Sequence, residues 1–163
     1  MTEIIDEVII AEPKGKVEDI NKLKNVIRFI LNNVSSTKYK TELIKLCFIV
    51  DYQYSKEKHK QNPTTVKYVR YNYGPYSDYF VEAFQELIKE KTIIEVSLPY
   101  GIGYNSISKD SLSMEQEIKD FILSVLKIYG KMSLKEMKEY IYNLPEFKQT
   151  EFGQEILINN ANW

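Results

Sequence analysis

The chain has 163 residues, of which 44% are hydrophobic, 28% charged and 13% aromatic. This composition is typical of one globular domain, alone or with a small appended unit, and it excludes disorder and disulfide-rich scaffolds. Uncharged apolar runs are short, so we expect no membrane span, and the acidic first residues lack the basic region of a signal peptide. The single cysteine, Cys47, cannot form an internal disulfide, which favours the cytoplasm.

The net charge of −1 is distributed unevenly along the chain. Residues 1–20 carry −4, residues 21–79 carry +7 and residues 80–163 carry −4. A basic middle between acidic ends is compatible with an anionic partner, and equally with surface ion pairs inside the fold. The sequence leaves both interpretations open.

The first third of the chain predicts two amphipathic helices. Residues 1–16 are an N-terminal segment in which residues 7–11 have the composition of a short strand. Apolar residues then recur at helical spacing over about 17–33 and about 38–57. Ser35-Ser36-Thr37 ends the first helix and offers an N-cap for the second.

A strand, a turn and a third helix follow. Residues 64–71 are rich in β-branched and aromatic side chains, which is typical of a strand. Tyr73-Gly74-Pro75 predicts a turn, because proline fixes φ and glycine permits a positive φ. Ser77 then offers an N-cap for a helix over about 77–91.

The second half of the chain predicts a β-hairpin and then further helices. Strand-like residues at 92–98 and 104–108 flank a glycine-rich tip. A helix over about 114–129 is expected to begin at a capping box at Ser113 and to end at Gly130. A second helix over about 134–143 is expected to begin at a capping box at Ser133 and to end before Pro145.

These elements predict an α+β protein that is predominantly helical, with a winged-helix-like core of helices, a strand and a β-hairpin, followed by C-terminal helices. The strand and turn between the second and third helices depart from a standard helix-turn-helix. The helical stripes predict a core made of Ile27, Ile30, Leu31, Leu43, Leu46, Cys47, Val50, Phe80, Phe84, Leu87, Phe121, Ile122 and Val125.

Two short motifs are more specific than the rest of the chain. The first, residues 45–51, fits a K-L-x-Y-x-x-D helix pattern with Phe48 at the aromatic position, and the second, residues 71–77, contains a Y-G-P-x-S turn. The matching residues are Lys45, Leu46, Asp51, Tyr73, Gly74, Pro75 and Ser77.

Together with the order of elements, these motifs resemble the Panacea domain of the SocA-like antitoxin family over roughly residues 20–145. The resemblance implies a domain over 17–145 and a tail over 146–163. It also implies an antitoxin of a toxin–antitoxin system, which neutralises its toxin by protein binding rather than by catalysis. After the third helix such proteins often carry a glycine, where this chain has Lys91-Thr92.

The chain offers little for catalysis or cofactor binding, and we expect no catalytic residue, metal or cofactor. Asp51, beside the apolar stripe, is expected to be a buried structural tie with a partner near Gly74 or on an adjacent helix; a carboxylate-based enzyme is the least favoured class. Cys47 is expected to be a small buried hydrophobe, and His59 lies in a basic connector. Gly101-Ile102-Gly103 lacks the following helix of a phosphate loop.

Two surfaces are candidates for a partner. The aromatic residues Tyr71, Tyr73 and Tyr76, with the third helix, are expected to contact a toxin-like protein, because tyrosine supplies large contact area at low entropic cost. The second choice is DNA, bound as a winged-helix-like transcriptional regulator would bind it. Its candidate contacts are Lys56, Lys58, Lys60, Lys67 and Arg70. The acidic third helix and the scarcity of arginine favour protein over DNA, and a homodimer is also compatible with the sequence.

Overall fold

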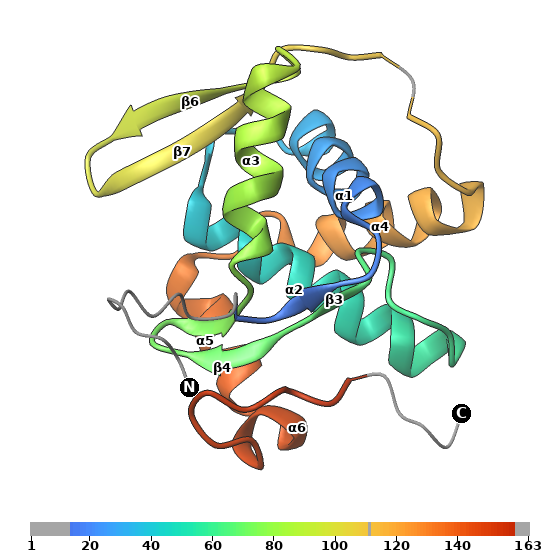
Figure 1. Cartoon of the computed structure of the whole chain (residues 1–163), viewed down its shortest axis with the longest axis vertical. Coiled ribbons are helices and arrows are strands. Elements are labelled where there is room, and N and C mark those ends of the chain that lie inside the picture. Colours follow the sequence, from blue (N-terminus) through green and yellow to red (C-terminus); the bar gives the residue numbers. More distant parts are fainter. Residues whose placement is uncertain (1–13, 111, 159–163) are drawn as a thin grey trace, which may run out of the picture.

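The computed structural model describes residues 14–110 and 112–158. Within them the chain is α+β and mainly helical (Figure 1). In chain order the elements are β1 (Lys16–Val17), α1 (Ile20–Asn33), β2 (Lys38–Tyr39), α2 (Lys40–Lys58), β3 (Val66–Lys67), β4 (Val69–Tyr71), β5 (Gly74–Tyr76), α3 (Tyr79–Lys89), β6 (Ile93–Leu98), β7 (Gly101–Ser106), α4 (Gln116–Tyr129), α5 (Leu134–Tyr142) and α6 (Pro145–Lys148).

The helix α2 lies at the centre of the fold. It contacts α1, α4, α5, β5 and β7, and Figure 1 shows it crossing the middle of the molecule. Leu43 and the run from Leu46 to Val50 are all fully buried, since neighbours cover more than one face of the helix. Of the predicted core residues, twelve are buried and Phe121 is partly buried against the same core.

The predicted hairpin forms and gains a third strand. β6 and β7 pair antiparallel and project from one side of the molecule, and β2 pairs with β7, so the strand order is β2-β7-β6 (Figure 1). The prediction of a glycine-rich tip was wrong, because Gly101 and Gly103 lie within β7. A Cβ on Gly103 would lie 2.7 Å from the Lys38 carbonyl oxygen, so this glycine allows β2 to approach.

The strand predicted over residues 64–71 is two short strands in different sheets. β3 pairs with β1, whereas β4 pairs with β5. The turn of the β4–β5 hairpin lies at Asn72–Tyr73, one residue before the predicted turn, because Tyr71 pairs with Gly74. The expected 7–11 strand lies outside the described residues.

Several predicted helix ends differ from the structure. Asp19 is the N-cap of α1, and residues 16–17 form β1 instead of starting the helix. α2 begins after Tyr39 and not at Ser35-Ser36-Thr37, since residues 38–39 pair with β7. The N-cap of α4 is Glu115, so the Ser113 capping box was wrong, while the Ser133 capping box is confirmed. Pro145 begins α6 as its first residue.

The C-terminal tail returns along β4. The backbone N–H of Gly153 donates to the carbonyl oxygen of Arg70 (2.7 Å), and the backbone N–H of Ile156 donates to the carbonyl oxygen of Tyr68 (2.8 Å). Phe147 and Ile156 are buried, whereas Phe152 and Leu157 are exposed. The tail thereby brings Phe152 next to the β4–β5 hairpin.

Candidate interaction surface

Lys45 joins the two sequence motifs in space. Its ammonium donates a hydrogen bond to the Tyr73 carbonyl oxygen, across 28 residues of sequence, and the residue is 2% exposed. Burial, followed by the positive charge of Lys138, lowers the pKa of Lys45 to about 8. The lysine therefore fixes the β4–β5 hairpin against the first half of α2.

Gly74 is required by conformation and by space. Its φ is +112°, which L side chains rarely adopt, and a Cβ there would lie 3.1 Å from Lys45 Nζ. Pro75 is the register partner of Arg70 in the hairpin. Together these residues let the turn lie close to α2.

The N-cap of α3 is Asp78, so the prediction that Ser77 would be the N-cap was wrong by one residue, although the Ser77 side chain still bonds to the first turn of the helix. The Ser77 hydroxyl accepts a hydrogen bond from the Tyr79 N–H (3.2 Å) and donates to the Gly15 carbonyl (2.9 Å). Gly15 has a φ of +67°, and a Cβ on it would lie 2.7 Å from the Ser77 Cβ. Gly15 is thus packed tightly against Ser77, just before α3.

Asp51 is fully buried and hydrogen-bonded, as expected, but its partners are not at Gly74. Its carboxylate accepts from the Thr64 N–H (3.1 Å), from the Thr64 hydroxyl and from the Tyr68 hydroxyl (2.7 Å). Six residues of helix, about 9 Å, separate Asp51 from Lys45, so Asp51 meets the connector after α2 instead of the hairpin. Burial raises the pKa of Asp51 to about 6, although its hydrogen bonds act in the opposite direction.

The predicted tyrosines gather on one surface with a residue from the tail. The Tyr71 and Tyr76 rings stack with centroids 5.7 Å apart, and the Phe152 ring lies 5.3 Å from Tyr71. Tyr73 is 71% exposed and Phe152 is 61% exposed. We call Tyr71, Tyr73, Tyr76 and Phe152 the aromatic corner. No local sequence signal could have placed Phe152 there, because the pairing of the tail with β4 is long-range.

A hollow of about 320 Å³ opens beside the aromatic corner. Its walls are residues 71–76 of the hairpin and four residues at the start of α2, Lys40, Thr41, Ile44 and Lys45. The hollow therefore combines aromatic and aliphatic walls with two lysines.

The third helix, α3, was expected to share this surface. It contributes instead mainly to the core and to ion pairs with Lys24. Phe80, Phe84 and Leu87 are buried. Lys24 on α1 binds two of its acids, Glu86 (3.1 Å) and Glu90 (2.5 Å).

Three of the candidate nucleic-acid contacts are paired with carboxylates. Lys56 bonds to Glu146, and both Lys58 (3.7 Å) and Lys60 (3.3 Å) bond to Glu117. The basic connector is thus partly neutralised by α4 and α6.

The other two candidates differ from each other. Arg70 donates to the carbonyls of Phe147 (3.1 Å) and Thr150 (2.9 Å), and its guanidinium lies 4.3 Å from the Phe147 ring centroid. Arg70 therefore holds the tail, while Lys67 is exposed on β3.

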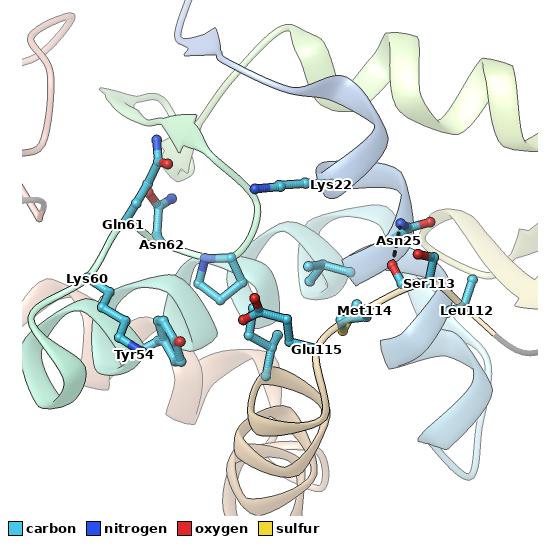
Figure 2. Close-up of a pocket in the computed structure, with 13 residues that line it drawn as sticks. Lys22, Asn25, Tyr54, Lys60, Gln61, Asn62, Leu112, Ser113, Met114 and Glu115 are labelled. Carbon is cyan, nitrogen blue, oxygen red and sulfur yellow. Dashed lines mark hydrogen bonds between the residues drawn. The ribbon is translucent and has the colours of Figure 1, made fainter.

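A second hollow, of about 650 Å³, lies between the start of α1, the connector after α2 and the segment before α4 (Figure 2). Lys22 and Glu115 enter it from different sides, and Asn25 Nδ2 donates to the Ser113 carbonyl (3.2 Å) on its rim. Its lining carries charges of both signs, and Asp51 lines neither hollow.

The remaining reactive residue types lie apart from both hollows. Cys47 is fully buried, and burial, followed by the charge of Asp51, raises its pKa well above the usual value. His59 is exposed at the end of α2, with φ +55°. Within residues 14–110 and 112–158, no three His, Cys, Asp or Glu side chains gather as a metal site would require. No helix in these ranges has the length and apolar character to cross a membrane.

Comparisons of the chain with protein-family models, curated proteins and solved structures found no significant match.

Proposed function

We propose that this chain is a non-enzymatic interaction module of the Panacea (SocA-like) antitoxin type, which acts in the cytoplasm and neutralises a toxin-like protein by direct binding. The observation that carries the proposal is the aromatic corner. It exposes Tyr73 and Phe152 beside stacked tyrosines and an apolar hollow, and such aromatic anchors next to pockets dominate protein interfaces.

The motif residues support this proposal by the way they divide their roles. Lys45, Asp51 and Ser77 are buried and bonded within the fold, and Gly74 provides the close approach of the hairpin. Tyr73 is the motif residue that presents its side chain to solvent. A rigid support under an exposed tyrosine reduces the entropic cost of binding.

The arrangement of the three-stranded sheet supports the winged-helix-like part of the proposal. A strand before α2 joins the β6–β7 hairpin, and α1, α2 and α3 pack beside it. The left-handed Lys91, with φ +62°, stands where the resemblance led us to expect glycine. Both features are compatible with the proposed family.

The environment of Asp51 supports a non-enzymatic role. Its carboxylate has no exposed surface, and both oxygens accept hydrogen bonds from Thr64 or Tyr68. A general base needs to reach a substrate proton, which this geometry does not allow without opening of the fold.

A winged-helix-like DNA regulator is the second candidate. Lys67 is exposed, and Tyr100, in the turn between β6 and β7, is 92% exposed, so both are accessible to a nucleic acid. The ion pairs of Lys56, Lys58 and Lys60 reduce the charge available for phosphates, and this places DNA second.

Site-specific photocrosslinking tests the proposal in the cells that natively carry the gene. p-Benzoylphenylalanine in place of Tyr73 should give an adduct of higher mass after irradiation that is unchanged by nuclease treatment. The same residue in place of Ile128, an exposed position on α4, is the matched control and should not give that adduct. A nuclease-sensitive adduct, or identical adducts at both positions, would reject protein binding at the aromatic corner.

A further inference from the structure

The hollow beside the aromatic corner has features that define what it can hold. Its volume of about 320 Å³ is at the small end of ligand sites, which suits one large side chain and its neighbouring backbone better than a cofactor. Ile44, Pro75 and the rings of Tyr71 and Tyr76 supply apolar walls. An aromatic or long aliphatic side chain would bury its surface there.

The charged side chains that line the hollow have one sign. Lys40 and Lys45 line it, and none of the residues lining it is acidic. Lys138 is near enough to Lys45 to act on it electrostatically, and Lys14 lies 5.1 Å above the Tyr71 ring. The start of α2, which also faces the hollow, carries the positive end of a 19-residue helix.

Two carboxylates lie near the hollow, and burial, followed by the charge of the nearby Asp78, raises the pKa of the Tyr76 hydroxyl. Asp78 accepts a hydrogen bond from the Lys14 backbone N–H (2.6 Å), and Glu42 in the first turn of α2 accepts one from the Tyr39 N–H (2.8 Å). An incoming carboxylate at the hollow would therefore meet Lys40 at the start of α2.

We propose that the hollow seats an aromatic or aliphatic side chain from an acidic segment of the partner, with a neighbouring carboxylate of that segment pairing with Lys40, which is partly exposed at the start of α2. This inference rests on the proposed function, because it specifies the chemistry of the protein that binds at the aromatic corner. The apolar side chain supplies the binding energy, and the acids select among partners.

A display library of random peptides of about twelve residues, selected on the full chain, provides the test. Enriched peptides should share one large apolar residue flanked by aspartate or glutamate. Their affinity should fall at least about tenfold in Tyr73→Ala and in Lys40→Glu, and should be unchanged in Lys127→Glu, a charge reversal on the exposed surface of α4.

Three results would overturn the inference: no enrichment, enriched peptides without acids, or acidic peptides indifferent to Lys40→Glu. Neutral peptides that still depend on Tyr73 would reject the acidic segment while leaving protein binding at the aromatic corner intact. Concentration-dependent dimers that Tyr73→Ala disrupts, seen by sedimentation, would instead assign the hollow to a second copy of this chain.

Discussion

Asp51 shows how one buried charge ties a helix to the chain that follows it. The carboxylate is inaccessible to solvent and receives hydrogen bonds from Thr64 and Tyr68, which lie beyond the end of α2. Tyr68 is itself fully buried, and its ring packs edge-on against Phe48 at 5.0 Å. The three residues form a polar link inside an apolar core, where an unpaired partner would be costly.

The stability contributed by Asp51 should depend on pH. In the fold its pKa is about 6, against an ordinary value of 3.8, so the folded chain holds a proton that the unfolded chain has lost between these pH values. The stabilisation of the fold by the protonated Asp51 carboxyl is complete below about pH 4 and is lost as the pH rises through 6. This loss lowers the free energy of unfolding by about 3 kcal/mol. Asp51→Asn should therefore gain stability relative to the unsubstituted protein from pH 4 to pH 8, as urea unfolding would measure.

A matched control separates this effect from amide substitution as such. Asp120→Asn changes an exposed aspartate on α4. An Asp51→Asn difference from the unsubstituted protein that stays constant over the same pH range would contradict the effect of burial on this carboxyl.

Leu46 tests the core at a single residue. Its side chain is fully buried on α2, so Leu46→Ala should lower the free energy of unfolding by about 2–5 kcal/mol. Ile128→Ala, at a position 62% exposed, should change it by less than about 0.5 kcal/mol. Equal midpoints for the two variants in thermal unfolding would contradict the assigned core.

Helix α3 ends in a strained backbone conformation at Lys91. Thr92 N–H bonds to the Leu87 carbonyl (3.1 Å) and Lys91 N–H to that of Ile88 (3.0 Å), which is the pattern of a Schellman motif. This motif places Lys91 in the left-handed region, at φ +62°, where glycine is preferred.

Lys91→Gly should consequently stabilise the protein by about 0.5–1 kcal/mol, because the left-handed conformation costs a β-carbon-bearing residue more than it costs glycine. Gln85→Gly, at an exposed position in the interior of α3, should destabilise by about 1 kcal/mol. Chemical denaturation of both variants measures the two effects. A loss of stability in Lys91→Gly would contradict the described end of the helix.

The longer elements could be predicted from the sequence, and the shortest could not. The stripes of α1, α3 and α4 repeat over three or more turns, so periodicity identifies these helices and their buried faces, whereas α2 is buried on more than one face. β1 and β2 have two residues each, which cannot show a period, and their partners lie far along the chain: Lys38 pairs with Tyr104. Only the tertiary fold determines such pairings.

The candidate site was predictable to a similar extent. The tyrosines of residues 71–76 stand together in the sequence, so an aromatic surface could be expected. Two features of the site depend on contacts between segments that are distant in sequence. They are the hydrogen bond from Lys45 to Tyr73 and the contact of the Phe152 ring with Tyr71. Asp51 was expected to be buried, but its partner Thr64 carries no local signal that relates it to α2.

The positive charge of residues 21–79 is partly balanced by acids from other segments of the molecule. Glu86 and Glu90 pair with Lys24, Glu117 pairs with Lys58 and Lys60, and Glu146 pairs with Lys56. The +7 of the middle segment does not therefore produce an equally strong basic face.

DNA binding should accordingly be weak. At about 150 mM salt, a duplex of about 20 base pairs should bind with a Kd above about 1 μM and without sequence preference, as fluorescence anisotropy would measure. Lys60→Glu and Lys67→Glu should have little effect on capture of the protein partner. Sub-micromolar, sequence-selective binding that these two changes abolish would favour the DNA regulator instead.

Protein binding at the aromatic corner is tested most directly by the affinity of the partner that crosslinks at position 73, measured by calorimetry with purified proteins. Tyr73→Ala and Tyr76→Ala should each weaken it by about 2 kcal/mol or more, a factor of about 30, while Ile128→Ala should leave it unchanged. Affinities of the two tyrosine variants within about twofold of the unsubstituted chain would contradict binding at this surface.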